Sequence, residues 1–164
     1  MRMTMEALRL QNQTVRYPFS SSSLSKLVGV HPKLVEFAFE LANVMDCKIV
    51  YGVRTDSEQM ELFKKEKTTF DGVNKRSKHQ VHTDGLGYAL DILPLPKGVN
   101  MYDKKDPENK LRWAQFDGVC QTIAYFMGIQ VRTGFKWRSN IMDSLARPEK
   151  DNTLPDGNHV ELVV

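Results

Sequence analysis

Cysteine is scarce in this sequence, which has only Cys47 and Cys120 among its 164 residues. The two cysteines form no CxxC pair, and each stands among apolar residues. Neither a disulfide framework nor a cysteine-ligated metal site is therefore indicated. We expect both to be small residues of the core.

Long hydrophobic runs are also missing. No stretch approaches the roughly 18 apolar residues that a membrane-spanning helix needs, and the opening MRMTMEALRLQNQ has no apolar segment typical of a signal peptide. We therefore expect no membrane insertion, and a protein that stays in the cytoplasm unless something else releases it.

An excess of one charge is nearly absent too, because the net charge is only +3 and the basic residues alternate with acidic ones. The densest basic cluster comprises Lys64, Lys65, Lys67, Lys75, Arg76 and Lys78. Such a cluster can attract an anionic polymer. A solvated surface is the commoner explanation, so we expect no nucleic-acid partner.

The content of 41% apolar and 26% charged residues is ordinary for one globular domain. We expect a loosely ordered lead-in over residues 1–23 and a folded domain over 24–164. Apolar periodicity, caps and turn residues predict the elements of that domain. The expected helices cover 32–46, 55–65 and 107–127, and the expected strands cover 48–53, 87–93, 129–132 and 159–164.

Histidine is rare, with four in the chain, and three of the four lie near acids. His79 and His82 precede Asp91, and His159 lies between Asp156 and Glu161. Two histidines and an aspartate would satisfy a catalytic zinc site, which takes three protein ligands and keeps one open position. The spacing alone is weak evidence, because it lacks the tight HExxH pattern and leaves surface or core histidines as the commoner reading.

Three short motifs occur in a specific order: Ser-x-His, Gly-x-Ala-x-Asp and a late His-x-Glu. They are Ser77-Lys78-His79, Gly87-Tyr88-Ala89-Leu90-Asp91 and His159-Val160-Glu161. From about Phe19 onward, the segments SLSKLVGVHPKLVEFAFELA, GVRTDSEQMELF and MGIQVRTGFKW also match. The chain thus resembles the zinc D-alanyl-D-alanine carboxypeptidases and L-alanyl-D-glutamate endopeptidases, in particular the compact phage endolysins.

The resemblance implies an α+β fold, a small antiparallel sheet flanked by helices, with one Zn²⁺ held by His79, Asp91 and His159. It implies hydrolysis of the peptidoglycan stem peptide by a phage or prophage endolysin, and the bond we expect it to cut is the one between L-alanine and D-glutamate. The expected partner is bacterial peptidoglycan, and the expected state is a monomer. An endolysin that waits in the host cytoplasm until it reaches the cell wall needs no signal peptide.

The resemblance also implies roles for two acids. Asp156 stands three residues before His159, where the endolysins carry their general base, although Pro155-Asp156-Gly157 is also an ordinary turn sequence. Glu161 follows His159 by two residues on an expected strand, hence on the same face. We expect Glu161 to serve the catalytic site by orienting a ligand; the alternative is a solvated edge residue.

Arg54 occupies the position of an arginine that faces the substrate and stabilises developing negative charge. The alternative is an ion pair with Asp56 or Glu58. Gln59, one turn further on, is expected to help bind the peptide, and Trp137 to line the peptide groove. An aromatic residue near a strand end is otherwise a core residue.

The segment Gln80–Leu86 is a departure from the family, because it has seven residues where two are usual. It contains His82, which makes His82 the alternative first metal ligand. Ser77 lies at the correct offset from His79, and lengthening a turn costs little closure entropy. We therefore expect His79 to be the ligand and His82 to be a loop residue near the cleft.

Two other functions remain open on the sequence. A D-alanyl-D-alanine carboxypeptidase or dipeptidase of the same family would release D-alanine rather than expose the amino group of D-glutamate. A metal-free binding module on the same fold would contain no zinc.

Overall fold

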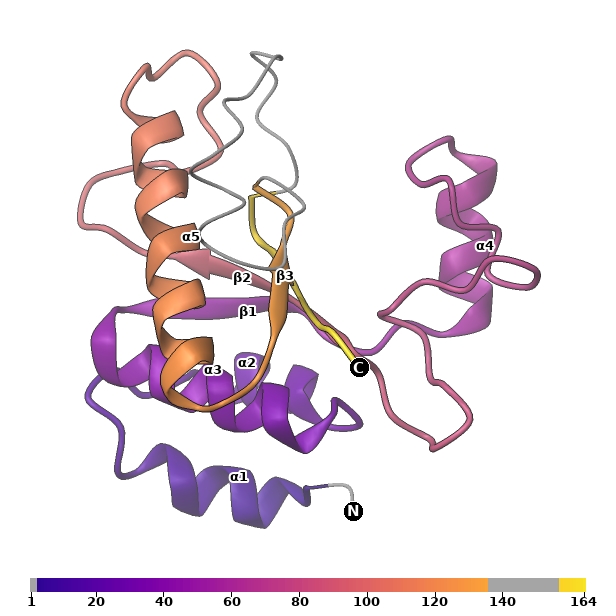
Figure 1. Ribbon diagram of the computed structural model, residues 1–164, viewed down its shortest axis with the longest axis horizontal. Helices are drawn as coiled ribbons and strands as arrows, with labels where there is room; N and C mark the ends of the chain where they lie inside the picture. The colour runs from indigo at the N-terminus through magenta and orange to yellow at the C-terminus, as the bar shows by residue number, and fades with distance from the viewer. Residues whose placement is uncertain (1–2, 136–156) are drawn as a thin grey trace.

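A four-stranded antiparallel sheet forms the centre of the protein, with helices around it (Figure 1). The computed structural model describes residues 3–135 and 157–164. The strand order is β1-β2-β4-β3. The strands are β1 Cys47–Tyr51, β2 Ala89–Pro94, β3 Val131–Thr133 and β4 His159–Leu162. The expected α+β class with a small antiparallel sheet is confirmed.

The helices of the described residues are α1 Met5–Asn12, α2 Ser21–Leu27, α3 Pro32–Val44, α4 Asp56–Lys64 and α5 Asn109–Phe126. Local signals explain several of their ends. Pro32 lies in the first turn of α3. Thr55 and Glu58 form the reciprocal capping box that opens α4. Gly128, with φ +64°, follows the end of α5.

The N-terminal region differs from the expected lead-in over 1–23, because α1 lies within it and α2 begins there. The Thr4 hydroxyl accepts a hydrogen bond from Ala7 N and caps α1. Leu8 has no exposed surface, so α1 is anchored in the core. The Asn12 amide exchanges two hydrogen bonds with the main chain of Phe19, at 2.7 and 3.0 Å. These contacts order a segment that has little apolar periodicity.

The two faces of the sheet differ in polarity. Residues opposite each other on neighbouring strands share a face, and successive residues alternate between faces. One face carries buried apolar side chains: Ile49, Leu90, Ile92, Val131, Val160 and Leu162. The helices α3 and α5 contact each other and complete the apolar core (Figure 1). Asp91, His159 and Glu161 point to the other face, which explains an acid on a mainly apolar strand.

The helix α4 lies beyond the end of β1, away from α3 and α5 (Figure 1). The chain then returns through residues 65–88 to start β2. None of the helices in the described residues is long and apolar enough to span a membrane.

We expect Leu90→Ala to lower the free energy of unfolding by about 2–5 kcal/mol, because it leaves a cavity in the centre of the core. Leu90 lies on the central strand β2 and has no exposed surface. Leu111→Ala is the control, since Leu111 is 59% exposed on α5 and its truncation should cost no more than about 0.5 kcal/mol. Chemical denaturation of both variants measures the difference, and equal losses would contradict this description of the core.

Candidate metal centre

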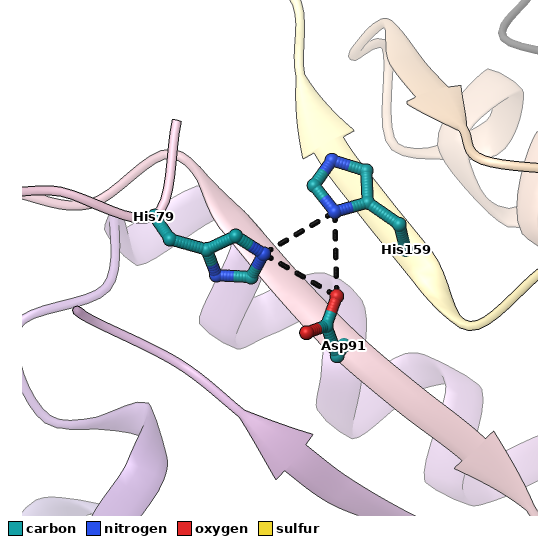
Figure 2. A group of neighbouring side chains, drawn as sticks. All are labelled: His79, Asp91 and His159. Atoms are coloured by element: carbon teal, nitrogen blue, oxygen red, sulfur yellow. Dashed lines mark hydrogen bonds and ion pairs between the residues drawn. The ribbon is translucent and has the colours of Figure 1, made fainter. Parts of the chain in front are cut away.

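Three side chains from distant parts of the sequence meet at one end of the sheet: His79, Asp91 and His159 (Figure 2). His79 lies in the turn that precedes β2, whereas Asp91 and His159 are register partners on β2 and β4. His79 Nε2 is 3.2 Å from His159 Nδ1. Asp91 Oδ1 is 3.3 Å from each of these two nitrogens. His82 is not a member of this group.

The spacing of the three donor atoms fits a tetrahedral metal site. Zinc binds histidine nitrogen and carboxylate oxygen at about 2.0–2.1 Å, so two ligand atoms of a regular tetrahedron lie about 3.3 Å apart. The three distances found here are 3.2, 3.3 and 3.3 Å. The three residues thus have the donor types and the separations needed to hold a metal ion.

The imidazole of His79 is held from behind by a main-chain oxygen. Its Nδ1 lies 2.8 Å from the carbonyl oxygen of Gly52. Because a carbonyl only accepts, Nδ1 is the protonated nitrogen, which leaves the Nε2 lone pair directed to the cluster. Gly52 itself is closely packed, since an added Cβ would lie 1.8 Å from the carbonyl oxygen of Lys26.

His159 is held from behind by a carboxylate. Its Nε2 lies 3.1 Å from Glu161 Oε2, and both residues are buried. The other oxygen of Glu161 accepts hydrogen bonds from Arg132, at 2.8 Å from Nε and 2.5 Å from Nη2. Glu161 therefore bridges a candidate ligand and an arginine. Arg132 was not among the site residues expected from the sequence. Its role as the partner of Glu161 follows from the β3–β4 register, which places the two residues opposite each other.

Opposing effects set the pKa values in this cluster. Burial favours the neutral form of Asp91, but hydrogen bonds from His159 and His79 outweigh it and keep the pKa of Asp91 well below its usual range. Burial also disfavours protonated His159, but Asp91 and Glu161 outweigh it and raise the pKa of His159 to about 9. The pKa of Glu161 is lowered against its burial by His159 and Arg132. The cluster thus stabilises positive charge between two carboxylates.

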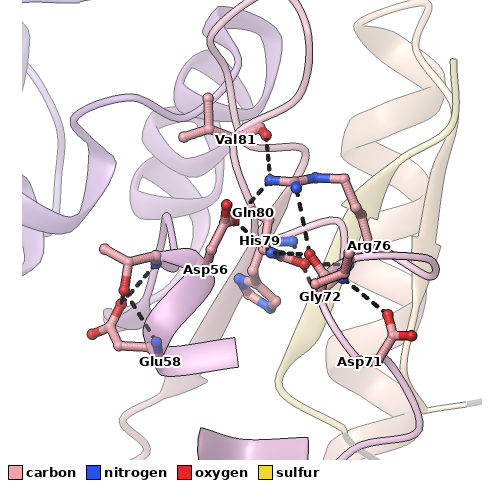
Figure 3. Close-up of polar contacts among 11 residues, drawn as sticks. Asp56, Glu58, Asp71, Gly72, Arg76, His79, Gln80 and Val81 are labelled. Atoms are coloured by element: carbon pink, nitrogen blue, oxygen red, sulfur yellow. Dashed lines mark hydrogen bonds and ion pairs between the residues drawn. The ribbon is translucent and has the colours of Figure 1, made fainter. Parts of the chain in front are cut away.

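The turn that carries His79 is fixed by a serine and a buried glutamine. The Ser77 hydroxyl accepts a hydrogen bond from His79 N at 3.3 Å. The side chain of Gln80 has no exposed surface, and its Oε1 accepts from Ser77 N at 2.9 Å. Its Nε2 donates to Asp56 Oδ1 at 2.7 Å and to Gly72 O at 3.0 Å (Figure 3). Gln80 thereby links the His79 turn to the start of α4.

The insertion that follows His79 closes on itself. Tyr88 N donates to Lys78 O at 2.7 Å, so the residues before and after the insertion are hydrogen-bonded to each other. Within the loop, His82 N donates to Leu86 O at 2.9 Å, and the His82 ring packs edge-on against Tyr88. The insertion therefore leaves His79 at the cluster and places His82 in a separate contact.

Arg54 lies next to the cluster at the end of the β1 segment. Its main-chain N donates to His79 O at 2.8 Å. Its guanidinium lies over the Tyr51 ring, 5.0 Å from the centroid, and the same ring meets the His79 ring edge-on at 6.0 Å. The main chain of Arg54 is thus bonded to that of His79, and its guanidinium packs on a tyrosine whose ring contacts the His79 ring.

The acids that would compete for Arg54 have other partners. Asp56 pairs with Arg76 at 2.8 Å, and Glu58 accepts from Thr55 and from the Tyr51 hydroxyl. Arg54 Nη1 instead donates to Gln59 Oε1 at 2.7 Å. Gln59, which we expected to touch the peptide, has no exposed surface.

Asp156 and Trp137 lie outside the described residues. Of the expected site residues, the structure brings together His79, Asp91, His159 and Glu161, with Arg54 beside them. His79, Asp91 and His159 form a group that could hold a metal ion, and Glu161 contacts one of its histidines.

Comparison with known proteins identifies the family. Residues 15–163 match the family described as phage L-alanyl-D-glutamate peptidase. The L-Ala D-Glu endopeptidase ChiX of Serratia marcescens has a similar crystal structure, with a TM-score of 0.61, 24% sequence identity and coverage of 86% of each chain. No curated protein sequence matches the chain. With nearly its whole length matched, the chain belongs to the phage L-alanyl-D-glutamate peptidase family, whose members hydrolyse peptidoglycan.

Proposed function

We propose that this chain is a zinc-dependent endolysin in which His79, Asp91 and His159 bind the ion and the L-alanyl-D-glutamate bond of the stem peptide is hydrolysed. One observation supports it above all. Two histidine nitrogens and one carboxylate oxygen converge at the separations of a tetrahedral site, in a peptidase family. Zinc when bound supplies a water of lowered pKa and polarises the scissile carbonyl.

The protein's own groups have separate tasks in this proposal. Gly52 O and Glu161 hold the two imidazoles in orientation, which is the role of such outer partners in metal sites. Asp156 accepts the proton of the attacking water as general base. Arg54 donates hydrogen bonds to the oxygen that becomes negative as the amide carbon turns tetrahedral.

The proposal assigns Glu161 to the orienting role because its carboxylate is already engaged on both sides. One oxygen pairs with His159 and the other with Arg132. A general base needs a free lone pair facing water. Asp156 is therefore the better candidate for the base.

The biological setting is part of the proposal. We infer a monomer that remains in the host cytoplasm and acts on the cell wall once it is released there. Mass spectrometry of digested peptidoglycan would separate this function from the D-alanyl-D-alanine carboxypeptidase alternative, because each exposes a different product.

Zinc dependence tests the proposal directly. Chelation should abolish wall lysis, and added zinc should restore it. His79→Ala should lose bound zinc, since a three-ligand site rarely tolerates loss of one ligand. His82→Ala is the matched control and should retain the metal, measured by elemental analysis of the purified protein. Full activity without metal would refute the mechanism, and zinc loss only in His82→Ala would move the first ligand to His82.

The division of labour between the carboxylates gives a second test. Asp156→Asn should keep zinc and lose at least about 10²-fold in kcat, the lower range for a general base. Glu161→Gln should instead weaken zinc binding, because the amide is a poorer partner for His159. Zinc titration and kcat are measured for both variants. A dead Glu161→Gln enzyme with full zinc affinity, beside an active Asp156→Asn enzyme, would reverse the assignment.

Gly52→Ala should weaken zinc binding by about 10–100-fold, the usual cost of disturbing an outer partner of a metal ligand. The new Cβ would lie 1.8 Å from Lys26 O, so the Gly52 carbonyl that orients His79 must move. Gly118→Ala is the control, because nothing lies within 4 Å of its added Cβ in α5. Competition with a fluorescent chelator measures both affinities, and unchanged affinity in Gly52→Ala would show that the carbonyl is dispensable.

A further inference from the structure

Gln59 is a polar residue near the start of α4 whose side chain has no exposed surface. We propose that Gln59 is a positioning residue that holds the guanidinium of Arg54 beside the His79–Asp91–His159 cluster. The inference rests on the proposed function, in which Arg54 faces the substrate. It replaces the expected contact between Gln59 and the peptide with an action through Arg54.

The chemistry of its two neighbours determines how the Gln59 amide is oriented. Its Nε2 donates to Phe70 O at 2.7 Å, and its Oε1 accepts from Arg54 Nη1 at 2.7 Å. A carbonyl only accepts and a guanidinium only donates, so the amide cannot be reversed without losing both bonds. Glutamine is thus the side chain that satisfies both partners at once.

The segment that follows α4 closes over this amide. Gly72 has φ +82°, and an added Cβ there would lie 2.8 Å from Gln59 Cγ and 3.2 Å from Gln80 Nε2. Gly72 therefore lets the main chain pack against two fully buried glutamines. The first of them holds Arg54, and the second holds the His79 turn. Arg54 and the His79 turn are therefore both held by glutamines that pack against the main chain at Gly72.

Gln59 completes a set of restraints on Arg54. The main chain of Arg54 is bonded to His79 O, and its guanidinium lies over Tyr51. The bond from Nη1 to Gln59 Oε1 adds a restraint on rotation of the guanidinium about its own axis. An arginine held in this way does not have to give up rotational freedom when the substrate binds. Such preorganisation is what a group that stabilises developing charge requires.

The test compares two substitutions of buried glutamine by methionine. Gln59→Met keeps the length of the side chain and removes both hydrogen bonds. It should retain zinc and lose on the order of 10²-fold in kcat, as expected for a misplaced catalytic group. Gln121→Met is the matched control, because Gln121 is 8% exposed on α5 and bonds Val131 O at 3.4 Å. That variant should keep the wild-type kcat.

A double-mutant cycle with Arg54→Ala separates positioning from a general structural effect. If Gln59 acts through Arg54, then Gln59→Met should cost no further kcat in the Arg54→Ala background. Independent losses that multiply would overturn the inference. Slow turnover in Arg54→Ala with wild-type turnover in Gln59→Met would overturn the inference alone. Unchanged kcat in Arg54→Ala would overturn both the inference and the proposed role of Arg54.

Gln59→Glu covers the case in which the methionine variant fails to fold. The carboxylate can still accept from Arg54 but cannot donate to Phe70 O. We expect its kcat to lie within about tenfold of wild type because the bond to Arg54 is kept, with a lower melting temperature because Phe70 O loses its donor and faces a carboxylate oxygen instead. A loss of kcat as large as that of Arg54→Ala, with zinc retained, would show that the bond to Arg54 does not position it.

Discussion

The pairing of β2 with β4 is the constraint on which the site depends. Asp91 and His159 are direct partners in this ladder, so their side chains leave the sheet on the same side. A slip of one residue would turn one of them into the core. The neighbouring pair, Leu90 and Val160, opposes such a slip because both are fully buried on the other face. The same register therefore specifies the apolar core and the candidate metal centre.

Charge balance explains why this polar face can be buried. Asp91 and Glu161 are acidic, whereas Arg132 compensates only one of the two negative charges. The remaining negative charge stabilises a cation between the imidazoles. Without a metal the cation is a proton, consistent with the raised pKa of His159. The protein thus keeps its candidate ligands close together by attraction rather than by packing alone.

Local signals predicted α3, α4, α5 and the four strands, because these depend on neighbours in the sequence, but they did not predict α1 or α2. The Thr55–Glu58 capping box is an example. The cluster could be anticipated only through family resemblance, since His159 lies 80 residues from His79 and 68 from Asp91. The burial of Gln59 and Gln80 had no sequence signal at all. A glutamine beside charged residues is normally exposed, and here its partners are supplied by tertiary contacts with Arg54, Phe70 and Gly72.

Gln80 and Gly87 bond the two ends of the insertion to the framework, and the bond from His82 N to Leu86 O closes the loop at its tip. Its two ends are joined whatever number of residues they enclose, so the entropic cost of lengthening it grows only slowly. Related enzymes can therefore acquire or lose residues here by insertion and deletion while the frame around His79 is preserved. Because the tip of this loop tolerates added residues, a reporter or an affinity peptide can be inserted there, next to the candidate metal centre.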